Sequence, residues 1–96
     1  MSELLNELQK GNHVIKLGAS WCGPCKAYAP AFEEATKDLS VAKAHSIDVD
    51  DHPEIAQHFN LHGVPTTILL KDGEAKVVRA GTMATHEVKE LITSTF

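Results

Sequence analysis

The 96-residue sequence lacks any long hydrophobic run. Its most apolar stretch, residues 64–70, is interrupted by threonines and falls far short of the roughly 18 residues that a membrane-spanning helix requires. The residues after Met1 show no basic start, apolar segment or small-residue cleavage site, so no secretory or lipidation signal is visible. We therefore expect a cytoplasmic protein without a membrane partner.

Positive charge is also scarce. The chain has 9 Lys and Arg residues against 13 Asp and Glu residues, and its basic residues form no cluster. Nucleic-acid binding needs such clusters to neutralise phosphates, so nucleic acid is not an expected partner. The hydrophobic fraction of 43 % and the charged fraction of 23 % are typical of folded domains. At this length we expect a single domain, residues 1–96, that acts as a monomer.

Cysteine is limited to two residues, in the segment Cys22-Gly23-Pro24-Cys25. Two cysteines are too few for a small extracellular disulfide scaffold, and this spacing favours a redox pair in a reducing compartment. Zinc and iron–sulfur proteins also use such pairs, but two thiolates fill a tetrahedral site only if a second copy supplies the rest. We therefore expect neither a metal nor a bound cofactor here.

Two other groups of polar residues could be mistaken for sites. His58 and His62 are four residues apart and could share a helix face as metal ligands, but the sequence offers no clear third ligand, so we expect solvated histidines. The acidic run at residues 48–51 is typical of a solvated turn, and we expect no chemistry from it.

Hydrophobic periodicity and turn residues predict the order helix, strand, helix, strand, helix, hairpin, helix. The first helix is expected after a Ser2 cap and before Gly11, and the later helices are expected to begin at Pro24, at Pro53 and after a Thr85 cap. The expected strands are residues 13–19, 43–49, 66–70 and 75–80, with a tight turn at Asp72-Gly73.

A right-handed crossover makes the first two strands parallel, whereas the hairpin adds antiparallel strands. The predicted fold class is therefore α/β, with a mixed four-stranded sheet flanked by helices on both faces. Within the second helix, Pro30 removes a backbone hydrogen bond, so we expect a kink rather than a break.

Three segments carry a family resemblance. The hexapeptide from Trp21 to Lys26 follows a buried strand, Val64-Pro65-Thr66 precedes the hairpin and Gly81 follows it. In order and spacing these residues resemble the thioredoxin family over nearly the whole chain. The resemblance implies the thioredoxin fold and a thiol–disulfide oxidoreductase that reduces protein disulfides. It also implies two kinds of partner, disulfide-containing client proteins and a flavoprotein thioredoxin reductase.

The local chemistry of the cysteine pair can be argued from the residues. Cys22 lies at a helix N-terminus, where unpaired N–H groups and the helix dipole favour an anion, so it is the expected nucleophile. Cys25 lies one turn further on, and we expect it to be more buried and to resolve the mixed disulfide. Gly23 leaves room for a substrate sulfur, and Pro24 restricts the backbone.

The substrate groove is inferred from the resemblance, which implies that Pro65 is cis and faces the cysteines. With Val64, Thr66, Gly81 and Trp21 it would line a shallow groove for an extended substrate segment. Trp21 could also be core filler, but its place beside Cys22 favours a lid over the sulfur.

Lys16 departs from the family pattern. Thioredoxins usually have an aspartate six residues before the nucleophilic cysteine, which is Lys16 here, and Ser46 stands where a lysine often occurs. A cationic Lys16 would stabilise the Cys22 thiolate and weaken the protein as a reductant, whereas a neutral one could act as the base for Cys25. Alternatively, its stem packs in the core and its ammonium reaches solvent or a carboxylate. Many members also have a strand before the first helix, so we expect a trimmed sheet.

Two other functions remain open. The same groove could dock a client in a redox-indifferent binding subunit or scaffold, although no insertion or basic surface supports this. An oxidase that donates disulfides is disfavoured by the Gly-Pro pair and by the missing secretion signal, although Lys16 would favour it.

Overall fold

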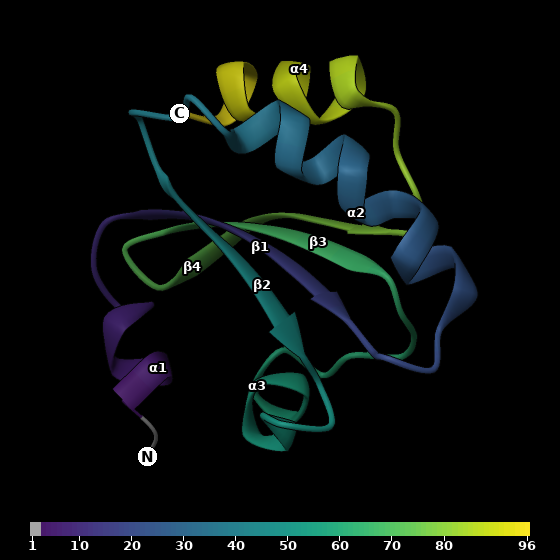
Figure 1. Ribbon diagram of the computed structural model, residues 1–96. Helices are drawn as coiled ribbons and strands as arrows, with labels where there is room; N and C mark the ends of the chain where they lie inside the picture. Colours follow the sequence, from purple (N-terminus) through teal and green to yellow (C-terminus); the bar gives the residue numbers. More distant parts are fainter. Residues whose placement is uncertain (1–2) are drawn as a thin grey trace.

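A computed structural model of the chain describes residues 3–96 (Figure 1). Its described strands are β1 (Asn12–Gly18), β2 (Lys43–Asp48), β3 (Thr66–Lys71) and β4 (Glu74–Ala80). The helices of the same residues are α1 (Glu3–Glu7), α2 (Gly23–Thr36), α3 (Pro53–His58) and α4 (Thr85–Thr95). This order is the one predicted, while the expected capping by Ser2 lies outside the described residues.

The four described strands form one sheet in the order β2-β1-β3-β4. β1 pairs in parallel with β2, and β3 is antiparallel to both β1 and β4. The β3–β4 turn holds Asp72 and Gly73 at φ of 50° and 86°, the positive values that a two-residue hairpin turn of this kind requires. The predicted mixed four-stranded sheet is confirmed.

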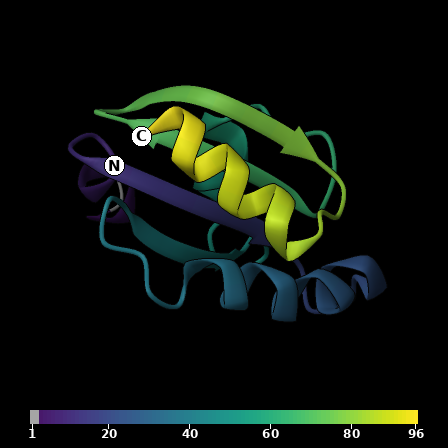
Figure 2. The same ribbon diagram turned by 90° about the horizontal axis from the view of Figure 1, so that it is seen from above.

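Helices cover both faces of the sheet (Figures 1 and 2). α1 and α3 pack on one face through Leu5 and Ile55, which join Ile15 and Leu17 of β1 in a buried cluster, and Leu8 joins it from just after α1. α2 and α4 lie side by side on the other face, where their buried side chains meet the opposite set of strand residues. That second cluster contains Val14, Tyr28, Phe32, Ala35, Leu69, Met83, Val88 and Ile92. β1 is therefore buried on both faces, as its sequence predicts.

α2 follows the prediction with differences at its ends. It begins at Gly23, one residue earlier than expected, and continues through the exposed Pro30 without a break. It ends at Thr36, so Leu39 packs against the core from beyond the helix. Ala27, which shares the helical spacing of the core residues, is exposed.

The predicted cap of α4 is wrong. The N-cap residue is Ala84, and Thr85 is the first helical residue. Alanine has no side-chain acceptor, so the helix start is held instead by Glu87, whose carboxylate Oε1 accepts the Ala84 N–H at 3.0 Å. The carboxylate also lies in the first turn, where the helix dipole favours negative charge.

Candidate active site

The two cysteines lie where the end of β1 passes into α2. Cys22 and Cys25 form a small buried cluster with Ala19, and Val49 and Val64 pack against it from two other segments. Both thiols are free. The cysteine pair therefore lies at one end of the sheet. It is surrounded there by the carboxyl ends of β1 and β2 and by the loop before β3.

Cys22 caps the N-terminus of α2. Its Sγ accepts the backbone N–H of Cys25 at 3.2 Å and lies 3.8 Å from the carbonyl oxygen of Val64, to which the thiol can donate. The first N–H groups of a helix have no partner within the helix, and a hydrogen bond to an ionised sulfur is stronger than one to a neutral sulfur. An ionised Cys22 sulfur therefore has a backbone N–H donor in place.

Cys25 is not distinctly more buried than Cys22, contrary to expectation: the exposed fractions are 5 % and 6 %. Burial nevertheless raises the pKa of the Cys25 thiol, and the hydrogen bond with Cys22 raises it further. A backbone hydrogen bond from Ala19 and the charge of Lys16 lower this pKa in part. Cys25 is therefore held as a thiol when Cys22 is the anion.

Gly18 is a site residue that the sequence analysis missed. A Cβ added to it would lie 3.3 Å from both Cβ and Sγ of Cys25, which is tighter than most real contacts. A glycine at the last position of a strand that leads to the cysteine pair was the only available signal.

Lys16 is half-buried in β1, opposite Ser46 of β2. Its Nζ lies 5.9 Å from the centre of the Phe32 ring, and its side chain lines a cavity of about 270 Å³ together with Cys25 and Asp48. Among the described residues no carboxylate forms an ion pair with Lys16. The structure thus places this lysine next to Cys25, facing a cavity rather than a counter-ion.

The predicted groove residues come together beside the cysteines. The Val64-Pro65 bond is cis, as expected, and the Pro65 carbonyl accepts the N–H of Gly81 at 2.9 Å. Thr66 is buried, with its hydroxyl donating to the Gly63 carbonyl at 2.8 Å, so its side chain holds the loop rather than facing solvent. Positions 23 and 81 are open, with no atom within 4 Å of an added Cβ.

Trp21 is 69 % exposed and so is not core filler. Its indole N–H donates to Asp50 Oδ2 at 2.9 Å. Asp50 is an exposed turn residue of the acidic run at residues 48–51, and its carboxylate accepts this hydrogen bond beside the cysteine pair. The available signal was the position of this run directly after a strand parallel to β1.

Other candidate ligands do not assemble. Within residues 3–96 no three His, Cys, Asp or Glu side chains are grouped so that they could hold a metal ion. His58 is the last residue of α3, and His62 lies beyond the helix, so the two do not share a helix face. No helix in the described part of the chain is long and apolar enough to cross a membrane.

Two free thiols three residues apart at a helix start, on this sheet, define the class of thiol–disulfide oxidoreductases. A family model described as Thioredoxin matches residues 2–94. The chain belongs to the thioredoxin family, and its activity is that of a thioredoxin-type protein disulfide reductase.

Individual relatives agree with this assignment. The thioredoxin of Mycoplasmoides gallisepticum is 37 % identical over 79 residues, which cover 82 % of this chain and 79 % of the relative. The thioredoxin of Mycoplasma genitalium is 34 % identical over 82 residues, with 85 % and 80 % covered. The solution structure of oxidised thioredoxin from Plasmodium falciparum superposes with a TM-score of 0.84 at 29 % identity, covering 98 % of this chain and 90 % of that one.

Proposed function

We propose that Cys22 is the nucleophile and Cys25 the resolving thiol of this reductase. The Cys22 thiolate attacks one sulfur of a client disulfide, a Cys22–client bond forms, and the other client sulfur leaves as a thiolate and takes up a proton. Cys25 then loses its proton to solvent and attacks Cys22 Sγ. The Cys22–Cys25 disulfide forms, the second client thiolate leaves, and two electrons have passed to the client.

The observation that carries this assignment is the asymmetry between the two sulfurs. Cys22 Sγ accepts a helix N–H, whereas burial raises the pKa of Cys25. Gly23 and Pro24 support the same roles, because position 23 is open to an incoming sulfur and proline restricts the first turn.

For the client we propose an extended segment docked across Trp21, Val64, Pro65 and Gly81. Thr66 supports this surface through its hydrogen bond to the Gly63 carbonyl. The exposed indole supplies apolar contact area, and backbone groups near the proline supply pairing for an extended chain. No cofactor is needed at this site, because the two thiols carry the electrons.

Lys16 is proposed to act as a cation behind Cys25. Its charge lowers the pKa of the Cys25 thiol, in opposition to burial, so it favours the thiolate that attacks in the second step. The cavity that both residues line would admit the water that takes the proton. This reading is favoured over a packed, carboxylate-paired lysine because none of the ion pairs among residues 3–96 includes Lys16.

We further propose that the chain works as a single monomeric domain in the cytoplasm, where a flavoprotein thioredoxin reductase returns the two electrons. Family membership supports disulfide clients and a reductase as the two partner classes.

The test uses insulin as the client, with turbidity as the readout. The wild-type protein with dithiothreitol should precipitate insulin chains, and Cys22→Ser should be inactive. Cys25→Ser should accumulate a mixed disulfide with the client, visible by mass spectrometry, and His86→Gln, on the exposed side of α4, should match wild type. If the protein is instead a redox-indifferent scaffold, wild type and Cys22→Ser should capture the client equally and neither should reduce it. Trapping at Cys25 instead of Cys22 would reverse the proposed roles.

A further inference from the structure

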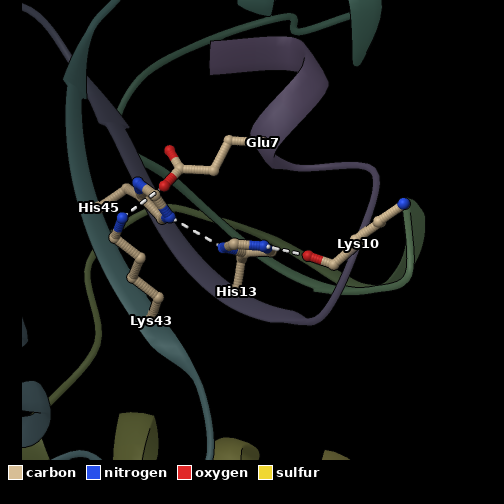
Figure 3. A network of polar contacts seen from close by, with 5 residues as sticks. All are labelled: Glu7, Lys10, His13, Lys43 and His45. Carbon is tan, nitrogen blue, oxygen red and sulfur yellow. Dashed lines mark hydrogen bonds and ion pairs between the residues drawn. The ribbon is translucent and has the colours of Figure 1, made fainter. Parts of the chain in front are cut away.

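A chain of hydrogen bonds links β2 to the loop before β1, at the end of the sheet away from the cysteines (Figure 3). His13 of β1 is 5 % exposed, and its Nδ1 lies 2.9 Å from Nε2 of the half-buried His45 of β2. The other ring nitrogen of His13, Nε2, lies 2.7 Å from the backbone carbonyl oxygen of Lys10. Both ring nitrogens of His13 are therefore engaged.

The protons of this chain can be assigned from the geometry. A carbonyl oxygen only accepts, so His13 Nε2 carries a hydrogen and donates it to Lys10. In a neutral ring His13 Nδ1 then has only a lone pair, so the hydrogen in the contact between the two rings belongs to His45 Nε2. A first added proton can go to the outer nitrogen of His45, Nδ1, and every hydrogen bond survives.

A second added proton has no such place. His13 Nδ1 and His45 Nε2 would then both carry hydrogen and face each other at 2.9 Å, so the contact must break. We propose that the His13–His45 pair is an acid-sensitive clamp, which stays closed with zero or one added proton and opens when a second one binds.

The charged groups around the pair come from α1 and from the strand that carries His45 itself. Glu7 of α1 and Lys43 of β2 form an ion pair beside His45. The pKa of His45 is lowered by burial first and then by the charge of His13, and Lys43 adds to this while Glu7 opposes it. The hydrogen bond from Lys43 lowers the pKa of Glu7 below its usual 4.5, so Glu7 is ionised across the range from pH 7 to 5. Loss of closure between pH 7 and 5 therefore reports on the histidine pair.

The clamp holds the segment that leads from α1 to β1. This segment carries Leu8, which is 2 % exposed in the core, and the Lys10 carbonyl that His13 binds. A separate anchor is independent of the histidines: the Gly11 N–H donates to the Asp72 carboxylate at 2.8 Å. A doubly protonated pair makes His13 a buried cation, so its ring must turn toward solvent and leave the Lys10 carbonyl. Opening of the clamp should thus release α1 locally while β1 stays paired in the sheet.

The size of the effect follows from proton linkage. The open state takes two protons near the ordinary histidine pKa of about 6.5, whereas the closed state takes only one. Opening should become at least roughly tenfold more frequent for each pH unit below that value, and the closed state is fully retained above it. The sign is a loss of α1 docking as the pH falls.

The test is amide hydrogen exchange of Leu8, whose N–H donates to the Leu4 carbonyl at 3.1 Å, in the full chain from pH 7.5 to 5. After correction for the intrinsic exchange rate, protection in wild type should fall by about tenfold per pH unit below 6.5. Long-range proton–nitrogen spectra of the rings should show hydrogen on Nε2 of both histidines at neutral pH. Protection of the Leu8 amide that does not change from pH 7.5 to 5, or a hydrogen on His13 Nδ1 at pH 7.5, would contradict the proposed clamp.

The decisive variant is His45→Gln. A glutamine amide can donate to neutral His13 and, after rotation, accept from protonated His13, so the clamp stays closed at every proton count. Its Leu8 protection should change less than twofold over the same range, whereas the exposed-histidine control His86→Gln should behave like wild type. If His45→Gln lost protection with acid as steeply as wild type, the histidine pair would not be the sensor. Insulin reduction by His45→Gln at pH 7.5 should be unchanged, because the pair lies away from the cysteines.

Discussion

The behaviour of Cys25 depends on a balance between burial and one nearby charge. Burial is the largest cause of its raised pKa, and Lys16 is the side-chain charge that opposes it. The electrostatic consequence belongs to a single side chain and can be tested by a single substitution.

Lys16→Met should raise the pKa of Cys25 further, because it removes the opposing charge and keeps the apolar stem. We expect the second step of disulfide reduction to slow by roughly twofold to fivefold near pH 7, because a smaller fraction of Cys25 is ionised for the attack. The second release of thionitrobenzoate from Ellman's reagent measures the step, since it occurs when Cys25 attacks the mixed disulfide. Lys26→Met is the matched control, because Lys26 lines the same cavity but is exposed. An unchanged second phase in Lys16→Met would leave the lysine with a packing role only.

At the scale of elements, α2 is joined to β3 through a buried polar contact as well as by apolar packing. The Tyr28 hydroxyl and Thr67 Oγ1 are 2.8 Å apart, and the two residues are 1 % and 0 % exposed. Buried polar groups of this kind are stabilising only while both partners are present. The contact therefore fixes the position of the helix that carries the cysteine pair.

Tyr28→Phe should lower the free energy of unfolding by about 1–3 kcal/mol, because it leaves the Thr67 hydroxyl buried without its partner. The double variant Tyr28→Phe with Thr67→Val removes both polar groups and should recover much of that loss. Denaturation in urea, followed by circular dichroism, measures the wild type, the two single variants and the double variant. If Thr67→Val lowers the free energy of unfolding as much in the Tyr28→Phe background as it does in wild type, the two hydroxyls act independently.

At the scale of the whole molecule, the raised pKa of Cys25 links stability to pH and to redox state. Cys25 ionises near 9.0 in an unfolded chain and above that value in the fold. The folded state then binds more protons than the unfolded state, so stability is complete below pH 9 and is lost as the pH rises through the folded pKa.

We therefore expect the reduced protein to lose stability between pH 9 and 10, by up to about 1.4 kcal/mol per pH unit. Cys25→Ala under the same reducing conditions should lose less, because the thiol with the raised pKa is gone. The window ends at pH 10 because burial also raises the pKa of Tyr28 above 10.0, which adds a second loss of the same sign at higher pH. Urea denaturation at pH 8, 9 and 10 measures the slope. Parallel slopes for both proteins would contradict the linkage.

The agreement between sequence and structure is greatest where local pattern decides. The turn at Asp72-Gly73 and the strand at Val14, Ile15 and Leu17 were predictable, since positive φ and burial on two faces each require particular residue types. The α4 cap was not, because Thr85 is a good cap by type, and only the reach of Glu87 to the Ala84 N–H places the helix start one residue earlier.

The fold class and the placement of two thiols at one helix start follow from local patterns along the chain. Two cysteines three residues apart, at the N-cap and in the first turn of one helix, lie together through local geometry alone. Contacts between residues far apart in the sequence depend on the packed fold: Asp50 accepts from Trp21, the Val64 carbonyl lies beside Cys22 and, at the far end of the sheet, His45 contacts His13. Such pairs depend on strand order and register, and these are set by the packing of the whole chain.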